Sequence, residues 1–292
     1  MQYMKPSTAA EASDILARNE GAARILGGGT DLLVQMRSGV IEPEMIVDIK
    51  YLDGIADITA EEGGLRIGAA VSGQHLGEHE GARAMWPGVV EACELIGSTQ
   101  IQGRCTMAGN LCNGGPAADS VPAMIAAAAV ARIEGPKGAR DCPVEEFVTG
   151  PGKTVLGKGE FVSSIFLPAR PKAASDAYLR FIPRTEMDIA VASAGVNIVL
   201  ADDGTIKSAR VALGAVGPKV VLVADAADAI IGSKLEDPAI AALVRAREAA
   251  ASPIDDKRGT VEFRTTVVGV LAKRAARIAM DRAQENATGE KT

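Results

Sequence analysis

The sequence predicts an α+β protein of two domains. The chain has 292 residues, more than the ~100–200 residues that usually make one domain. Short apolar segments bounded by Gly and Pro, typical of strands, are interspersed with segments of helical periodicity. Residues 168–175, rich in Pro, Ala and Lys, have the composition of a linker. We therefore expect one domain over residues 1–172 and a second over residues 173–292.

The first domain is expected to begin with a helix and a strand that ends in glycine. Apolar residues at helical spacing predict a helix over residues 8–18, capped by Ser7 or Thr8. The apolar segment 23–26 predicts a strand that runs directly into three glycines. The next expected elements are strands at 45–49, 55–59, 64–67 and 69–71 and a helix over 81–93.

The remaining elements follow from the same patterns. A helix over residues 120–129, capped by Asp119 or Ser120, precedes expected strands at 130–133, 154–156 and 160–167. The second domain is expected to hold strands at 177–183, 189–200 and 206–213, the last two joined by a hairpin turn. Helices are expected at 223–231, 238–250 and 260–284, and the polar residues 285–292 are expected to be frayed.

Charge and hydropathy exclude two classes of partner. The net charge is −6, and acidic and basic residues are interspersed, so no basic surface for nucleic acid is expected. The longest apolar run, residues 121–131, is shorter than the ~20 residues of a membrane-spanning helix. The N-terminus also lacks the pattern of a signal peptide. We therefore expect no membrane span and a cytoplasmic location.

The cysteines and histidines do not predict a metal site. The four cysteines show no CxxC spacing, and they are Cys93, Cys105, Cys112 and Cys142. We expect them to be small core or loop residues. His75 and His79 stand four residues apart, but without a nearby cluster of cysteines or carboxylates they are expected to be surface residues.

Two glycine-rich segments are the strongest functional signal. Residues 27–29 are three consecutive glycines after the strand at 23–26, and residues 97–115 form a second glycine-rich region. Exposed backbone N–H groups in such loops form concave binding sites for phosphate oxygens. One such loop alone is more often a tight turn, and neither the GxGxxG nor the GK[ST] motif is present. Two loops together could hold one diphosphate.

These segments resemble those of a known family. The first reads Gly27-Gly28-Gly29-Thr30-Asp31-Leu32-Leu33, followed by Met36-Arg37. The second reads Thr106-Met107-Ala108-Gly109-Asn110-Leu111, continuing as Gly115-Pro116-Ala117-Ala118-Asp119-Ser120. Both are similar to the cofactor loops of the FAD-binding medium subunits of molybdenum hydroxylases, the xanthine oxidase and carbon monoxide dehydrogenase flavoprotein family. Ala108 and Gly115 depart from the family pattern without removing a backbone donor.

The resemblance extends over nearly the whole chain. Later matches, in the family's order, are Ile165 to Pro168, Arg184 with Asp188-Ile189-Ala190, Gly214-Ala215-Val216, Pro253-Ile254-Asp255-Asp256 and Phe263-Arg264. It implies an α+β fold like that of vanillyl-alcohol oxidase (PCMH type), with FAD-binding subdomains over about 1–55 and 56–172. A C-terminal domain like that of the carbon monoxide dehydrogenase flavoprotein, a three-stranded antiparallel sheet with helices, would follow.

The resemblance also implies cofactor-binding residues. The first group is Leu26, Gly27, Gly28, Gly29, Thr30, Asp31 and Leu32, and the second is Thr106, Met107, Ala108, Gly109 and Asn110. Both would bind the FAD diphosphate, mainly through backbone N–H groups. Asp119 would lie on the adenosine side, unless it only caps a helix. Ile96 would pack beside the cofactor. Arg180 would be a cation near the flavin, unless it is a solvated strand residue.

The implied function is electron transfer. A partner subunit with two 2Fe–2S clusters would take electrons from a large molybdopterin subunit and pass them to non-covalently bound FAD, which would pass them to NAD⁺, oxygen or a quinone. No catalytic side chain and no metal ligand are expected in this chain, because the cofactor carries the chemistry. Two alternatives stay open: a self-contained FAD oxidase or dehydrogenase of the same fold, and a non-catalytic nucleotide-binding or assembly protein.

Overall fold

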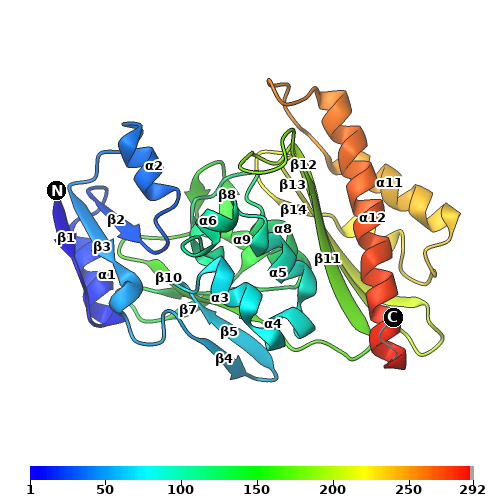
Figure 1. Ribbon diagram of the computed structural model, residues 1–292, viewed down its shortest axis with the longest axis horizontal. Coiled ribbons are helices and arrows are strands. Elements are labelled where there is room, and N and C mark those ends of the chain that lie inside the picture. The colour runs from blue at the N-terminus through cyan, green and yellow to red at the C-terminus, as the bar shows by residue number, and fades with distance from the viewer. Residues whose placement is uncertain (290–292) are drawn as a thin grey trace.

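The computed structural model describes residues 1–289. Figure 1 shows an elongated molecule with β1 at one end and the long helix α12 at the other. Within the described residues the strands form sheets of three, five, four and two strands. The three larger sheets follow one another along the chain, and the predicted α+β fold is confirmed.

The first sheet is small and parallel. Its strand order is β1-β3-β2, with Leu26 paired to Asp48 at the end of the ladder. Because all three strands run in one direction, their carboxyl ends meet at one edge, where the three glycines leave β2. The elements of this subdomain are β1 (Gln2–Met4), α1 (Ala9–Arg18), β2 (Ala23–Leu26), α2 (Leu32–Arg37), β3 (Met45–Asp48) and the 3-10 helix η1 (Ile49–Tyr51).

The second sheet is antiparallel and centres on β10. Its order is β4-β5-β10-β6-β7, and most β10 side chains are buried. The strands are β4 (Ile58–Glu61), β5 (Gly64–Gly68), β6 (Val130–Glu134), β7 (Arg140–Pro143) and β10 (Phe161–Leu167), with β8 (Val148–Gly150) and β9 (Lys153–Thr154) as a separate pair. The strand expected at 55–59 begins later, because residues 49–57 form a 3-10 helix and turns.

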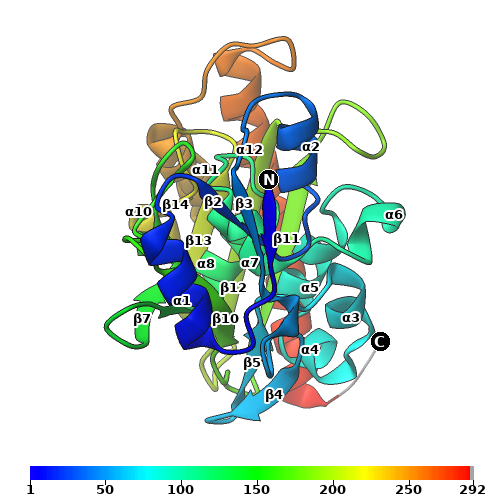
Figure 2. The same ribbon diagram turned by 90° about the vertical axis from the view of Figure 1, so that its left-hand side faces the viewer.

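Helices cover the second sheet and differ in part from expectation. The single helix expected over 81–93 is wrong: Trp86 ends α4, and Pro87 starts α5 at the first helical position, where its missing N–H costs nothing. The helices are α3 (Gly73–Glu78), α4 (Glu80–Met85), α5 (Pro87–Glu94), α6 (Thr99–Gln102), α7 (Met107–Cys112), α8 (Ser120–Ala126) and α9 (Val144–Phe147). In the end-on view of Figure 2, α1 lies on one side of the molecule and α3 to α5 on the other.

The C-terminal domain is an antiparallel sheet of order β11-β12-β13-β14 with α12 packed against β11 and β12. The three expected strands are present, and a two-residue edge strand is added. The elements are β11 (Ala174–Phe181), β12 (Ala192–Leu200), β13 (Ile206–Gly214), β14 (Val221–Leu222), α10 (Ala224–Asp228), α11 (Asp237–Ala250) and α12 (Val261–Thr288). The helix continues to Thr288, so residues 285–288 of the expected frayed end are helical; residues 290–292 lie outside the described residues.

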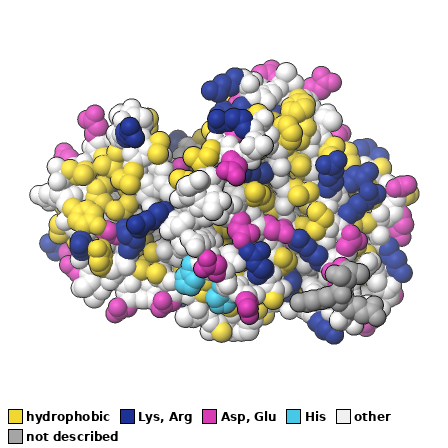
Figure 3. Space-filling model, in the orientation of Figure 1, with side chains coloured by type: hydrophobic (Ala, Val, Ile, Leu, Met, Phe, Trp, Pro, Cys, Tyr) yellow, Lys and Arg dark blue, Asp and Glu magenta, His cyan; other side chains and the backbone are white. Residues whose placement is uncertain are grey.

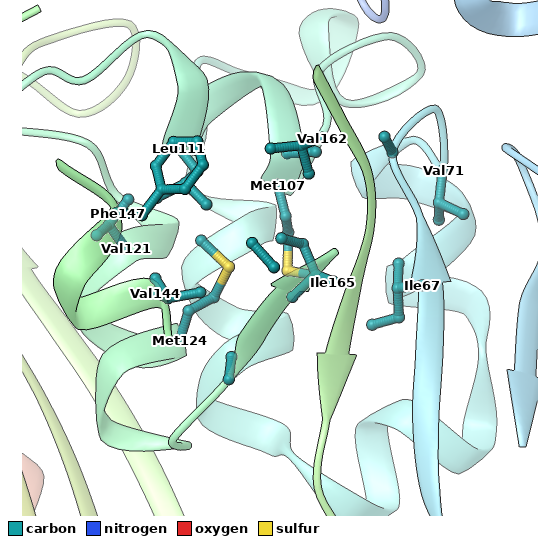
Figure 4. Close-up of a cluster of buried hydrophobic side chains, with 14 of the residues drawn as sticks. Ile67, Val71, Met107, Leu111, Val121, Met124, Val144, Phe147, Val162 and Ile165 are labelled. Carbon is teal, nitrogen blue, oxygen red and sulfur yellow. The ribbon is translucent and has the colours of Figure 1, made fainter. Parts of the chain in front are cut away.

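The two domains pack closely. A Cβ on Gly195 of β12 would lie 2.5 Å from the Pro122 carbonyl oxygen of α8, so the sheet and this helix are in backbone contact. Figure 4 shows the core beneath α8, where Met107, Leu111 and Met124 pack together with Ile165 of β10. No helix within residues 1–289 is long and apolar enough to cross a membrane.

Candidate functional site

The two glycine segments lie against each other. We call residues 26–32 the first loop and residues 104–110 the second loop. A Cβ on Gly28 would lie 2.0 Å from the carbonyl oxygen of Arg104 and 3.2 Å from the Cα of Cys105. No side chain fits at such a separation, so only glycine allows the two backbones to approach this closely. The first loop follows directly on β2, and its contact with Arg104 and Cys105 places it beside the residues that precede α7.

A cavity of about 350 Å³ lies between these loops. Its polar rim is formed by residues of both loops together with Gln35 and Asn113. Its wall also includes Ile96, the partly exposed Cys112 and the buried Cys105. The other apolar lining residues are Leu16, Ala23, Ile25, Ile49, Ala69, Leu156 and Val162, and Arg24 and Glu160 also line the cavity. The lining therefore combines residues of both loops with aliphatic side chains and two charged ones.

The first loop offers free backbone donors. The N–H groups of Gly28, Gly29, Thr30 and Asp31 have no hydrogen-bond partner among the described residues. Gly29 has φ of +81°, and a Cβ there would also lie 2.8 Å from Leu26 Cδ1. Both the backbone conformation and the lack of space therefore favour glycine at this position. Leu26 packs beneath the turn and does not line the cavity. Unpaired N–H groups that border a cavity are suited to an anionic ligand.

The second loop adds two more donors. Thr106 caps α7: its hydroxyl accepts a hydrogen bond of 2.9 Å from the Gly109 N–H. The N–H groups of Thr106, Met107 and Ala108 have no partner among the residues that the structure describes, and of these three residues Thr106 and Ala108 line the cavity. Met107 does not line it, and its side chain points into the core (Figure 4). The Thr106 hydroxyl only accepts in this cap, so its own O–H can still donate to a ligand.

Asn110 ties the second loop to the next helix. Its side-chain oxygen accepts hydrogen bonds from the Ser120 N–H at 3.0 Å and from the Ser120 hydroxyl at 2.7 Å. The residues between them, 111–119, include the segment Gly115-Pro116-Ala117-Ala118 of the sequence motif. The motif is therefore explained in part by this contact, which sets the position of α7 against α8.

Asp119 and Arg180 form one buried ion pair. Arg180 Nη1 donates to Asp119 Oδ2 at 2.7 Å, and the Tyr178 hydroxyl donates to Asp119 Oδ1 at 3.2 Å. The adenosine-side role expected for Asp119 and the flavin-side role expected for Arg180 thus concern two side chains in direct contact, and both roles stay predictions. Neither residue lines the cavity between the loops. Asp119 also makes no side-chain cap hydrogen bond to α8.

Burial governs the charge state of this pair. Burial raises the pKa of Asp119, and the guanidinium of Arg180 opposes that shift. Arg180 is itself only 6% exposed, and its Nε is buried without a partner in the described part of the chain. It is therefore not a solvated strand residue. A buried cation with one donor free can hydrogen-bond to a ligand that reaches it.

The thiols and histidines carry no separate site. Burial raises the pKa of Cys105 to about 11 and that of Cys112 to about 12, so both remain protonated at neutral pH. His79 caps α4 by accepting from the Ala82 N–H. Among residues 1–289 no group of three or more His, Cys, Asp or Glu side chains could hold a metal ion.

Sequence reasoning missed several cavity residues. Gln35 donates to Asn113 at 3.0 Å and so links α2 to the end of α7 across the rim of the cavity. Asn113 directly follows α7, but nothing in its local sequence distinguishes it from a turn residue. Leu16, Leu156 and Val162 come from three separate elements and show only ordinary apolar periodicity. Only the packing of the two subdomains brings them together.

Two family models together match most of the chain. Residues 1–170 match the model described as "FAD binding domain in molybdopterin dehydrogenase". Residues 177–279 match the model described as "CO dehydrogenase flavoprotein C-terminal domain".

Full-length relatives give the same picture. The chain is 31% identical over 274 residues to the xanthine dehydrogenase FAD-binding subunit of Escherichia coli, with 93% of both chains covered. It is 30% identical over 282 residues to the carbon monoxide dehydrogenase medium chain of Afipia carboxidovorans, with 97% of both covered. Among solved structures, a chain of reconstituted CO dehydrogenase from Oligotropha carboxidovorans superposes with a TM-score of 0.93 at 29% identity, covering 97% of this chain and 98% of that one.

Proposed function

The chain belongs to the family of FAD-binding subunits of molybdopterin dehydrogenases, and from this premise we propose that it relays electrons through FAD within a heterotrimeric molybdenum hydroxylase. The protein is thus an oxidoreductase subunit and a flavoprotein. The proposal concerns its partners, its electron acceptor and the residues that hold the cofactor.

One observation carries the assignment of the site: two backbone segments with free N–H groups meet at one cavity. The first loop offers four such donors and the second loop offers two more. A diphosphate carries its charge on oxygens that accept hydrogen bonds from backbone amides. We therefore assign the diphosphate of FAD to the contact between the loops, with Thr30 adding a hydroxyl donor.

The remaining predicted residues take their roles from this placement. The aliphatic side chains of the cavity lining, which include Leu16, Ile25 and Leu156, are suited to packing against the adenine ring. Ile96 packs along the wall. The Asp119–Arg180 pair then lies on the flavin side, where Asp119 holds the guanidinium in place.

The relay itself needs no acid or base from this chain. When bound, FAD can accept electrons one at a time and pass them on in pairs. The protein would position the cofactor and exclude water from it. We propose a small 2Fe–2S subunit as the donor, fed by a large molybdopterin subunit, and NAD⁺, oxygen or a quinone as the acceptor. We propose a cytoplasmic location for the complex.

Co-expression with the two partner subunits tests the proposal. The chain should purify yellow, and the complex should reduce the flavin when substrate is supplied to the molybdopterin subunit. Rapid mixing of the reduced complex with NAD⁺, oxygen or a quinone identifies the acceptor as the one that reoxidises the flavin fastest. A chain that oxidises a substrate at its own flavin without partners contradicts the relay, and a colourless chain contradicts the flavin assignment.

A further inference from the structure

A network of three polar side chains lies directly behind the first loop. Lys50 Nζ donates to the Gly27 carbonyl oxygen at 3.3 Å and to Asp48 Oδ1 at 2.6 Å. Asp48 Oδ1 also accepts from the Lys50 N–H at 3.0 Å, and Asp48 Oδ2 accepts from the Tyr3 hydroxyl. Nothing in the loop motif itself points to these residues, since Tyr3 lies on β1 and Asp48 ends β3.

The network is built rather than accidental. The Asp48 side chain is 2% exposed, and a buried carboxylate is costly unless its oxygens are hydrogen-bonded. Burial acts to raise the pKa of Asp48, but the hydrogen bonds from Lys50 and Tyr3 outweigh it and hold the pKa below its ordinary value. The same hydrogen bond raises the pKa of Tyr3 to about 12. Asp48 is therefore an ionised acceptor that fixes the Lys50 ammonium at the end of the parallel sheet.

The hydrogen bond from Lys50 to the Gly27 oxygen also fixes the direction of the Gly28 N–H. The peptide bond between Gly27 and Gly28 is trans, because the described chain has no cis peptide bond. In a trans peptide the C=O and the following N–H point in opposite directions. Holding the Gly27 oxygen toward Lys50 thus directs the Gly28 N–H away from Lys50. Gly27 and Gly28 line the cavity and Lys50 does not, so the N–H is directed to the cavity side.

We propose that Lys50, held by Asp48 and Tyr3, is a positioning residue that orients the Gly27–Gly28 peptide for the diphosphate of FAD. This role rests on the proposed cofactor site. The Lys50 charge is neutralised by Asp48, so its effect is orientation of the peptide and not attraction of the phosphates. Glycine has no side chain to restrain its φ and ψ, and the three consecutive glycines need such an external restraint.

FAD titration of the apo full chain, followed by flavin fluorescence quenching, tests the proposal. Lys50→Met removes the donor but keeps the length of the side chain, and we expect FAD binding about tenfold weaker. Lys50→Arg restores the donor and should bind within about threefold of the wild type. Tyr3→Phe removes one restraint on Asp48 and should cost about threefold. Tyr51→Phe is the matched control, because Tyr51 is a neighbouring exposed tyrosine whose hydroxyl makes no hydrogen bond to Asp48 within the described residues, and it should change nothing.

Non-additivity separates positioning from a general structural effect. If Tyr3 acts only through Asp48 and Lys50, then Tyr3→Phe in the Lys50→Met background weakens FAD binding no further. Lys50→Met and Tyr3→Phe each remove a hydrogen-bond donor from the buried Asp48 carboxylate, so the urea midpoint of each apo variant should fall, and the FAD titrations are made where circular dichroism shows every variant folded. A wild-type chain that binds no FAD overturns the proposed function. A wild-type chain that binds FAD, with Lys50→Met binding it equally tightly, overturns the role of Lys50 alone. Additive losses or an Arg variant as weak as Met also overturn it.

Discussion

The contact between the two loops makes Gly28→Ala the most informative substitution. The added Cβ would lie 2.0 Å from the Arg104 carbonyl oxygen, whereas real Cβ atoms stay beyond 3.0 Å from such neighbours, so the loops must separate by about 1 Å. The obstacle is backbone, which cannot rotate aside as a flexible side chain can. Overpacking of this kind costs about 1–3 kcal/mol. If FAD binds only when the two loops are in contact, the variant must bring them together to bind FAD, and this free-energy cost lowers the affinity.

At tenfold per 1.4 kcal/mol, the predicted loss of FAD affinity is roughly five- to 150-fold. The assay is titration of the apo chain with FAD, with circular dichroism to show that the secondary structure is retained. Gly115→Ala is the control, because a Cβ there has nothing within 4 Å and its φ is not positive. The reasoning is refuted if Gly28→Ala binds FAD as tightly as the wild type, or if Gly115→Ala loses as much affinity.

Three further predictions follow from the same structure. Gly109→Ala should fold normally, because its Cβ meets only Thr106 Oγ1, at 3.0 Å. It should bind FAD several-fold more weakly, because the added methyl group lies in the wall of the cavity. Equal affinity in the FAD titration contradicts this prediction. Asp176 on β11 is buried and ion-paired with Arg170 at 3.1 Å, and burial raises its pKa from 3.8 to about 6. The folded state therefore binds a proton more tightly than the unfolded state, and the stability that this proton gives is lost as pH rises from about 4 through 6. In urea unfolding, the stability advantage of the wild type over Asp176→Asn should therefore shrink across that range, and an advantage that grows with pH contradicts the assignment. Burial raises the pKa values of Cys105 and Cys112, so iodoacetamide at pH 7.5 should label both at least tenfold more slowly than a free thiol of ordinary pKa about 8.5. Mass spectrometry measures the labelling, and labelling at the rate of a free thiol would contradict their burial.

The sequence predicted best the elements whose pattern is local and periodic. The strands β2, β3 and β10 and the long helix α12 carry continuous apolar or amphipathic patterns, and they lie where expected. Helices α3 and α7 were missed because each contains glycine and only six residues, so packing rather than propensity makes them helical. Pro87 was read as part of a longer helix, although its position at the start of α5 is one that proline favours.

The site was predicted as two segments but not as a contact. Residues 27–29 and 106–110 are visible as motifs, whereas the approach of Gly28 to Arg104 depends on how the two subdomains pack. The pairing of Asp119 with Arg180 joins residues 61 positions apart on different domains, so no local pattern could indicate it. For the same reason the sequence did not indicate the Tyr3–Asp48–Lys50 network, whose members come from two strands and a 3-10 helix.

The most direct test of the account is a crystal structure of the full chain with FAD bound. It should place the diphosphate oxygens within about 3.2 Å of backbone nitrogens from both loops, at Gly28, Gly29 or Thr30 on one side and at Thr106 or Ala108 on the other. A cofactor whose diphosphate touches only one of these segments, or that binds outside the cavity between them, would contradict it.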